Sequence, residues 1–269
     1  MKVNISAVII TFNEEKNIER CILSLKNVVD EIVVVDSFSK DKTQEICLAH
    51  NVVFIEHAFK GHIEQKNWAY TQAKNNYVLS LDADEALSEE LKKSILAVKN
   101  NWRNDGYAFN RLTNYCGKWI KHCGWYPDVK LRLWDRRKGV WKGVNPHDCF
   151  EMEKGIKPIH LTGDLLHYSY YTIEEHIKQI NYFTDIAAKA YVQKGAKPSL
   201  FKVFASAKFM FFKTYFLKLG ILNDKIKYKP YWKLNDLRNI VKDDYYRNYL
   251  ETKIKKELKQ ISPYNYTGI

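Results

Sequence analysis

An apolar run that stops at a cluster of carboxylates restricts the fold of this sequence more than any other feature. Residues 77–81, YVLSL, have the character of a buried strand, and Asp82, Asp84 and Glu85 follow directly. Carboxylates held so close repel one another, so they raise the pKa of one member or require a cation. Mg²⁺ or Mn²⁺ would satisfy them, because both ions prefer oxygen ligands and complete their shells with water and substrate phosphates. The other interpretation is a turn that caps a helix near Ser88, since Asp is common in turns.

Strand-like and helix-like segments alternate through the first 100 residues. Residues 5–11, 31–35 and 52–55 are short, β-branched and apolar, as expected of parallel strands buried on both faces. Asn13 is the expected N-cap of the first helix and Asp41 that of the second, and residues 61–73 form a third predicted helix. The alternation predicts an α/β fold with a mainly parallel sheet and helices on both faces.

Polar residues follow these strands at the same end. Thr11 with Asn13, then Asp36, and then Asp82 with Asp84 come where separate predicted strands stop. Ligands bind beyond the carboxyl ends of the strands in a doubly wound sheet, so these residues should meet at one edge. Each of them alone could be a turn residue. Together they predict a binding site.

The segments SAVIITFNEEKNIERCILSL, DEIVVVDSFSKDKT, QKNWA and VLSLDADE resemble the nucleotide-sugar half of family 2 glycosyltransferases, which have the GT-A fold. Within that family the sequence is most similar to bacterial lipopolysaccharide-core and glycan glucosyltransferases. Those proteins also show segments like GWYPDVKLRLWDRR, residues 124–137, and GVNPHDCF, residues 143–150. The resemblance covers roughly residues 3–223 and fades beyond them.

The resemblance implies a role for each matching residue of the nucleotide half. Asp82-Ala83-Asp84 would form the metal and diphosphate corner, with Asp82 near the ribose and Asp84 on a Mn²⁺ or Mg²⁺ ion. From the residues alone, a solvated helix lysine is the favoured interpretation of Lys66, and Asp36 could equally be a turn carboxylate. The remaining implied contacts are Thr11, Asn13 and Glu14 lining the nucleotide pocket, Asp36 accepting from the uracil N–H, and Lys66 near the diphosphate.

Asp148 is the expected general base. In an inverting transfer the acceptor hydroxyl attacks the anomeric carbon while the nucleotide diphosphate leaves, so a carboxylate must take the hydroxyl proton. The family places its base after the D-x-D strand, on a loop that opens a helix. Here His147-Asp148 stands where close relatives often show His-Glu, and the side chain is one methylene shorter. Asp128 is therefore the reserve candidate.

The middle of the chain has the composition of a sugar-binding surface. Residues 102–150 are rich in Trp, Tyr, Arg and Gly, with strand-like pieces at 106–112 and 129–134. Arg132 could contact a phosphate or pair with Asp135, and His167 could be a further metal or phosphate ligand. The candidates for the acceptor site are Trp125, Tyr126, Arg132 and His147, although each aromatic residue here, taken singly, is more often a core residue.

The last quarter of the chain is strongly basic. The chain carries a net charge of +12, and residues 198–269 hold 15 Lys or Arg against 6 Asp or Glu. Residues 199–219 combine large apolar side chains with four lysines, which suits a helix lying on an anionic membrane, although an ordinary packing helix is the alternative. Residues 199–259 are the candidate membrane contact. We expect a GT-A domain over residues 1–170, with a nucleotide half to about 100 and an acceptor half beyond, and a helical basic region over 171–269.

The leading hypothesis is a metal-dependent inverting glycosyltransferase that moves one hexose, glucose by resemblance, from a UDP-sugar to a cell-surface glycan or glycolipid. The five scattered cysteines and the N-terminus without a signal-peptide pattern favour the cytoplasm, with contact to the inner membrane face. A sugar-phosphate nucleotidyltransferase is one rival, but it should carry a Gly-rich loop after the first strand. A non-enzymatic basic protein is the other. No nucleic-acid partner is expected, because no such signature is present. The donor sugar, the acceptor and the oligomeric state stay open.

Overall fold

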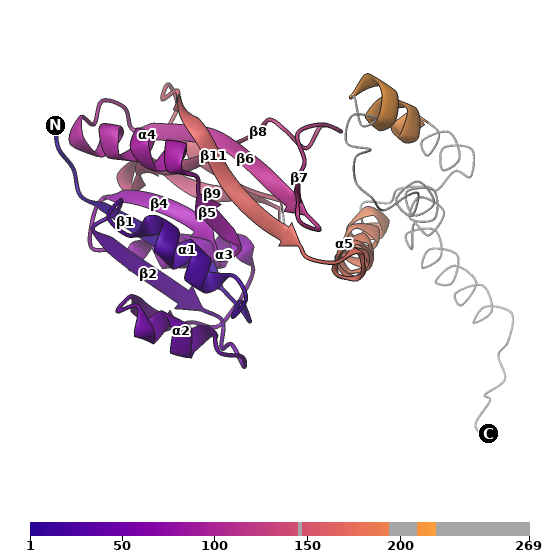
Figure 1. The fold of residues 1–269 in the computed structure, drawn as a ribbon, viewed down its shortest axis with the longest axis horizontal. Coiled ribbons are helices and arrows are strands. Elements are labelled where there is room, and N and C mark those ends of the chain that lie inside the picture. Colours follow the sequence, from indigo (N-terminus) through magenta and orange to yellow (C-terminus); the bar gives the residue numbers. More distant parts are fainter. Residues whose placement is uncertain (145–146, 194–208, 219–269) are drawn as a thin grey trace, which may run out of the picture. The chain divides into compact units, whose positions relative to one another are not determined.

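A computed structural model describes residues 1–144, 147–193 and 209–218 of this protein, and they divide into two compact units (Figure 1). The first unit consists of residues 1–121 and 125–169. The second contains residues 122–124 and the described residues from Tyr170 onward. The functional halves expected within the first unit stay predictions.

The first unit is built on one mixed sheet, whose strands run in the order β3-β2-β1-β4-β8-β6-β11-β5, with β7 paired to β6. The strands β3, β2, β1 and β4 pair in parallel and form the predicted nucleotide half. The strands β8, β6, β11 and β5 extend the sheet through antiparallel pairs. The strand bounds are Ile5–Thr11 (β1), Glu31–Asp36 (β2), Val53–Glu56 (β3), Tyr77–Asp82 (β4), Glu85–Leu87 (β5), Gly106–Tyr115 (β6), Lys118–Trp119 (β7), Asp128–Asp135 (β8) and Ile159–Tyr170 (β11).

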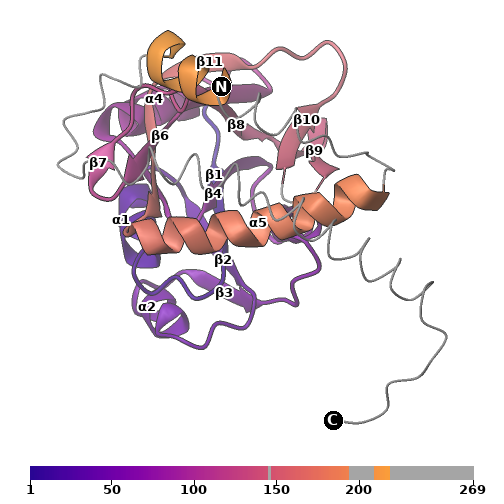
Figure 2. The same ribbon diagram turned by 90° about the vertical axis from the view of Figure 1, so that its right-hand side faces the viewer.

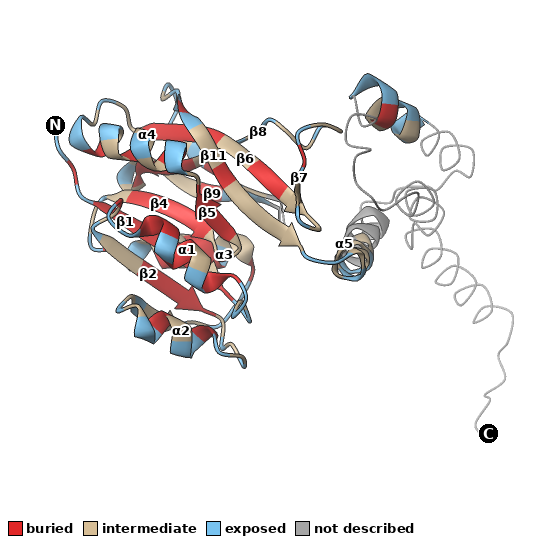
Figure 3. Cartoon of the chain, in the orientation of Figure 1, coloured by how far each residue is buried: buried red, intermediate tan, exposed pale blue. Residues whose placement is uncertain are grey.

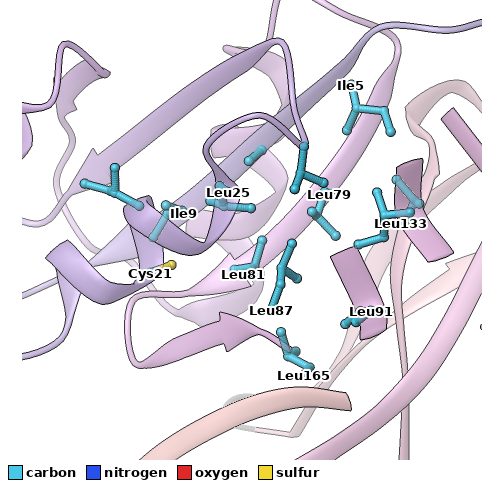
Figure 4. Close-up of a cluster of buried hydrophobic side chains, with 14 of the residues drawn as sticks. Ile5, Ile9, Cys21, Leu25, Leu79, Leu81, Leu87, Leu91, Leu133 and Leu165 are labelled. Carbon is cyan, nitrogen blue, oxygen red and sulfur yellow. The ribbon is translucent and has the colours of Figure 1, made fainter. Parts of the chain in front are cut away.

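The central strands are buried on both faces, as their apolar sequences predict (Figure 3). In β4, Leu79 and Leu81 join one buried cluster, while Val78, the neighbour of Leu79 on the opposite face, joins another. The first cluster takes residues from α1 and α4 and is drawn in Figure 4. The second contains Ala69 of α3 and a group of aromatic residues. The helix bounds are Ile18–Leu25 (α1), Thr43–Ala49 (α2), His62–Thr71 (α3) and Glu89–Asn100 (α4).

The expected cap at Asn13 is wrong. Helix α1 begins only at Ile18, and Asn13 has a left-handed backbone with φ 55°. Its side-chain oxygen accepts from the N–H of Lys40 at 2.7 Å, so Asn13 joins two loops instead of capping a helix. Asn tolerates this conformation because its short polar side chain can hydrogen-bond locally. Ser88, by contrast, caps α4 and accepts from the N–H of Leu91 at 3.2 Å.

A separate two-stranded hairpin, β9 (Gly139–Val144) and β10 (His147–Met152), carries the expected base (Figure 2). Its aromatic residues Trp141 and Phe150 pack on Trp134 of β8, and the rings of Phe150 and Trp134 stack with centroids 3.9 Å apart. Asp148 therefore lies on a strand. The expectation of a loop that opens a helix is wrong, because residues 147–152 pair with β9.

The second unit contains helix α5, Ile173–Gln193, and a described helical segment over residues 209–218. The predicted capping box is present: Thr172 Oγ1 accepts from the N–H of Glu175, and Glu175 Oε2 accepts from the N–H of Thr172, both at 3.1 Å. Most of the candidate membrane contact, residues 199–208 and 219–259, lies outside the described residues. In the part of the chain that is described, no helix has the length and apolar character needed to span a bilayer.

Gly163 of β11 allows a close approach that a side chain would prevent. Its φ is 96°, and a Cβ there would lie 2.2 Å from the backbone nitrogen of Leu91 at the start of α4. Gly155 has a similar φ of 94°, but a Cβ there would meet nothing within 4 Å. Alanine at position 163 would therefore introduce both a steric clash and backbone strain, whereas alanine at position 155 would introduce backbone strain alone.

We expect Gly163→Ala to lower the free energy of unfolding by about 3 kcal/mol or more, because strain and a backbone clash act together. Gly155→Ala should cost only about 1 kcal/mol, the price of the left-handed conformation. Urea unfolding followed by circular dichroism measures both. Equal losses in the two variants would contradict the packing of β11 against α4.

Candidate active site

Lys66 joins two carboxylates that are distant in the sequence. It lies on α3 and is buried, with 5% of its surface exposed. Its Nζ is 3.1 Å from Oδ1 of Asp82, at the end of β4, and 2.8 Å from Oδ2 of Asp148 on β10. The same Nζ lies 4.6 Å from the centroid of the Trp141 ring, within the range of a cation–π interaction. Lys66 is therefore a buried ion-pair residue and not a solvated helix lysine.

Arg132 of β8 binds the same carboxylate from the other side. Its Nη2 is 2.9 Å from Oδ2 of Asp82 and 2.9 Å from Oε1 of Glu85. Burial alone would raise the pKa of Asp82, but Lys66 and Arg132 outweigh it and hold that pKa well below its ordinary value. The carboxylate repulsion predicted from the sequence is thus balanced by two buried protein cations.

The structure also decides between the two alternatives for Arg132. Asp135 pairs with Arg137, whose Nε donates to Asp135 Oδ1 at 2.8 Å, and not with Arg132. Arg132 points to the carboxylate cluster instead, and its Nη1 is buried with no partner among the described residues. A buried guanidinium N–H without a partner is costly, which marks this position as one where a ligand oxygen or a water molecule would be stabilising.

Asp84 and His167 form a second pair next to this cluster. His167 Nε2 lies 3.1 Å from Asp84 Oδ2, because β11 pairs with β5 and places His167 opposite Glu85. Burial alone would lower the pKa of His167, but the nearby Asp84 outweighs it and raises the pKa above the ordinary value. A carboxylate oxygen such as that of Asp84 suits Mn²⁺, and both residues were singled out in the sequence.

The described residues contain no group of three or more His, Cys, Asp or Glu arranged to hold a metal ion. The pair of Asp84 and His167 still fits Mg²⁺ or Mn²⁺, since these ions need few protein ligands when water and substrate phosphates complete the shell. Asp82 differs from Asp84 because both of its oxygens already have cationic partners. Direct metal binding by Asp82 stays a prediction.

Thr11, Asn13 and Asp36 meet at the carboxyl ends of β1 and β2, where Thr11 pairs with Asp36 in the parallel register. Asp36 is buried and accepts from the N–H of Ser39 at 2.7 Å. The N–H of Asn13 donates to Ser39 Oγ, also at 2.7 Å. The hydroxyl of Thr11 is buried and has no partner among the described residues. The two loops form one hydrogen-bonded edge.

Glu14 is the carboxylate of this edge with the most altered acidity. Burial, opposed by a hydrogen bond from Asn17 and assisted by the charge of Asp84, raises its pKa from 4.5 to about 7. Asn17 Nδ2 donates to Glu14 Oε2 at 2.7 Å. A carboxyl group with a raised pKa beside an acidic cluster is typical of a functional site.

The acceptor candidates are more dispersed. Tyr126 donates to Asp164 Oδ1 at 3.1 Å, and Trp125 makes an edge-to-face contact with Tyr115. The side chain of His147 lies outside the described residues. Asp128, the reserve base, has Arg111 Nη2 and Lys130 Nζ each at 2.9 Å. Asp128 and Asp148 are thus both ion-paired, and the choice of Asp148 as the base stays a prediction.

Several site residues escaped the sequence analysis. Gln65 lies between His57 and Ser37, with its Oε1 2.8 Å from His57 Nδ1 and its Nε2 3.2 Å from Ser37 Oγ. Its only signal was its position beside Lys66 in the segment QKNWA. Arg111, 3.6 Å from Glu85, gave no signal because its position on β6 becomes meaningful only when the sheet is assembled.

Comparisons with known proteins identify the family of the chain. The model of the family described as glycosyl transferase family 2 matches residues 6–157. An uncharacterized glycosyltransferase of Rickettsia typhi is 30% identical over 270 residues, covering 91% of this chain and 92% of that protein. The lipopolysaccharide core biosynthesis glycosyltransferase LpsC of Rhizobium meliloti is 28% identical over 232 residues, covering 80% and 82%. Among solved structures, S. aureus TarS in complex with UDP-GlcNAc aligns with a TM-score of 0.36 and 25% identity, over 41% of this chain and 35% of that chain.

The raised pKa of Glu14 generates a prediction for stability. Because the pKa is about 7 in the folded protein and 4.5 ordinarily, the folded state disfavours ionisation of Glu14. The stability that Glu14 contributes is complete below pH 4.5 and is lost as the pH rises through 7. Glu14→Gln should therefore be more stable than the wild type by about 1–2 kcal/mol at pH 8, after a discount for partial solvent screening, and nearly equal to it at pH 4.5.

Urea unfolding of both proteins at pH 4.5 and 8 measures this difference. Glu89→Gln is the control, because a hydrogen bond from Lys92 lowers the pKa of Glu89 and its loss should not stabilise the protein at pH 8. A stability difference for Glu14→Gln that is the same at both pH values would contradict the assignment.

Proposed function

Because the chain belongs to glycosyl transferase family 2, we propose that it is a metal-dependent inverting enzyme that transfers a single hexose from a UDP-sugar to a cell-surface glycan. The proposed hexose is glucose, and the proposed acceptor is a lipopolysaccharide core or a similar glycan. The acceptor class is supported by the similarity to the lipopolysaccharide core glycosyltransferase of Rhizobium meliloti.

One observation carries the proposal: Lys66, Asp82 and Asp148 meet at one place although they come from α3, β4 and β10. Lys66 Nζ lies 3.1 Å from Asp82 and 2.8 Å from Asp148, so the carboxylate of the predicted base is close to the end of β4, the strand that ends at the first D-x-D residue. A nucleotide-sugar enzyme needs this combination, with a base on one side of the anomeric carbon and cations near the leaving diphosphate.

In the proposed reaction Asp148 accepts the proton of the acceptor hydroxyl. The hydroxyl oxygen forms a bond to the anomeric carbon while the bond from that carbon to the diphosphate oxygen breaks, and the diphosphate leaves with the electron pair. Lys66 and Arg132 are buried cations, so they can stabilise the negative charge that develops on the diphosphate in a site of low dielectric constant.

Asp84 and His167 would hold the Mn²⁺ or Mg²⁺ ion, which when bound offsets charge on the diphosphate. The 3.1 Å separation of Asp84 Oδ2 and His167 Nε2 supports this assignment. The edge formed by Thr11 and Asp36 is the proposed uracil site, because an unpartnered buried hydroxyl and a buried carboxylate suit the polar groups of a base.

Single addition is favoured over polymer synthesis, because the sequence contains no Q-x-x-R-W segment of the kind that processive synthases of this superfamily use. The proposed location is the cytoplasm, at the inner face of the membrane. In the second unit, Phe209, Phe212 and Leu217 are more than half exposed next to Lys213 and Lys218, which supports contact with an anionic lipid surface.

We expect Asp148→Asn to reduce hydrolysis of UDP-glucose, assayed with Mn²⁺, by a factor of about 10²–10⁴, because the amide cannot accept the proton. Binding of UDP with Mn²⁺, measured by calorimetry, should be retained. Asp128→Asn is the matched variant, since Asp128 is the reserve candidate. If Asp128→Asn abolished hydrolysis while Asp148→Asn preserved it, the base would be Asp128. If UDP-, GDP- and dTDP-sugars all failed to bind the wild type, the proposed function would be wrong.

Removal of a proposed metal ligand should weaken Mn²⁺ binding specifically. We expect His167→Ala and Asp84→Ala each to reduce the affinity for Mn²⁺ in the presence of UDP by about 10–100-fold. Electron paramagnetic resonance of free Mn²⁺ measures this affinity independently of catalytic activity. His160→Ala is the control, because His160 is exposed and bonds Asn110. Unchanged Mn²⁺ affinity in both site variants would exclude this pair as the metal site.

A further inference from the structure

We infer that Lys66 holds the proposed base in an ion pair until the donor diphosphate takes the lysine away, so that Asp148 becomes free only when the donor is bound. This inference rests on the proposed function, in which Asp148 is the base. It makes Lys66 a positioning residue that links donor binding to the start of the reaction.

The two carboxylates that pair with Lys66 differ in whether they keep another ion-pair partner if the lysine moves. Asp82 keeps Arg132, whose Nη2 lies 2.9 Å from its other oxygen. Within the described residues, the carboxylate of Asp148 makes an ion pair with Lys66 alone, at 2.8 Å. Movement of Lys66 therefore leaves Asp82 paired and frees Asp148. The ion pair between Lys66 and Asp148 can therefore open without leaving Asp82 unpaired.

The ion pair is incompatible with the role of a base. Asp148 has its Oδ2 occupied by the ammonium group of Lys66 at 2.8 Å. It must also present an oxygen to the acceptor hydroxyl at hydrogen-bond distance. Asp148 has 12% of its side-chain surface exposed. The pair with Lys66 therefore has to open before Asp148 can act.

The donor supplies the reason for opening. A diphosphate carries several negative oxygens, and the lysine ammonium is a compact charge on a flexible four-carbon stem that can turn towards it. The protein exchanges one ion pair for another, so no buried cation is left without a partner.

Trp141 keeps this movement short. Its ring lies beneath Lys66 Nζ at 4.6 Å, so the ammonium can turn over the ring without losing the cation–π contact. The Asn67 side chain, next to Lys66 on α3, holds the backbone of Trp141: it donates to the backbone carbonyl at 2.9 Å and accepts from the backbone N–H at 3.0 Å. The Trp141 ring packs edge-to-face against the rings of Trp134 and Phe150. Only the lysine side chain has to change conformation.

Carboxylate labelling with a water-soluble carbodiimide and glycine ethyl ester tests the inference directly. Trypsin cleaves after Lys142 and Lys154, so Asp148 lies on the same peptide as Glu151, which is 52% exposed and serves as the internal standard. The ratio of label on Asp148 to label on Glu151 is measured with and without UDP and Mn²⁺. A thermal shift under the same conditions establishes whether UDP binds.

We expect UDP with Mn²⁺ to raise the Asp148 to Glu151 ratio in the wild type by about fivefold, the factor that corresponds to loss of a partly screened ion pair. Lys66→Met should show the raised ratio without UDP and no further increase with it. Lys66→Arg, which keeps the positive charge, should restore the low ratio in the absence of UDP. Lys130→Met is the matched control, because Lys130 pairs with Asp128, and it should behave as the wild type.

The result that overturns the inference is a wild type that binds UDP, as the thermal shift shows, while the Asp148 ratio stays low. The proposed function would survive that result. A wild type that shows no thermal shift with any nucleotide sugar would remove the proposed function and this inference together. The wild-type measurement does not depend on a substitution, so it remains decisive even if Lys66→Met fails to fold.

Discussion

The structure depends on the compensation of negative charge at the end of β4. Asp82 and Glu85 are held close together there, and two buried cations, Lys66 and Arg132, share Asp82 between them. Each cation comes from a different element, so the charge balance can exist only when α3, β4 and β8 are in place. Loss of Lys66 would leave the mostly buried carboxylate of Asp148 without its ion pair, which is more costly than loss of a surface pair. The site and the fold therefore stabilise each other.

The same compensation separates two roles for the acidic residues. Asp82 is satisfied by protein cations, while Asp84 pairs with His167 and is the proposed metal ligand. Asp148 joins the network through Lys66 from a hairpin that is not part of the main sheet. The network thus connects the part of the protein proposed to bind the nucleotide with the part proposed to carry the base. A change at the diphosphate site can reach the base through a single side chain.

The sequence predicted most of the nucleotide half because its signals are local. The strands β1, β2 and β4 are continuous apolar runs, and burial on both faces leaves no other arrangement for them. Asn13 was misread for a local reason too, since a residue that favours helix caps also favours the left-handed turns of loops. The sequence analysis missed the hairpin that carries Asp148, because the pairing of its strands β9 and β10 depends on aromatic packing against β8.

By itself the sequence determined the alternation of strands and helices, the carboxylate cluster and its position at a strand end, since these follow from residue type and spacing. It could not decide whether Arg132 pairs with Asp135, because both are near in sequence and the choice depends on which strands lie side by side. Only the tertiary structure placed Lys66 and Asp148 2.8 Å apart across 82 residues of chain. An ion pair depends on two charges lying within a few ångströms of each other in space. The separation of two residues in the sequence does not show whether the fold brings them that close.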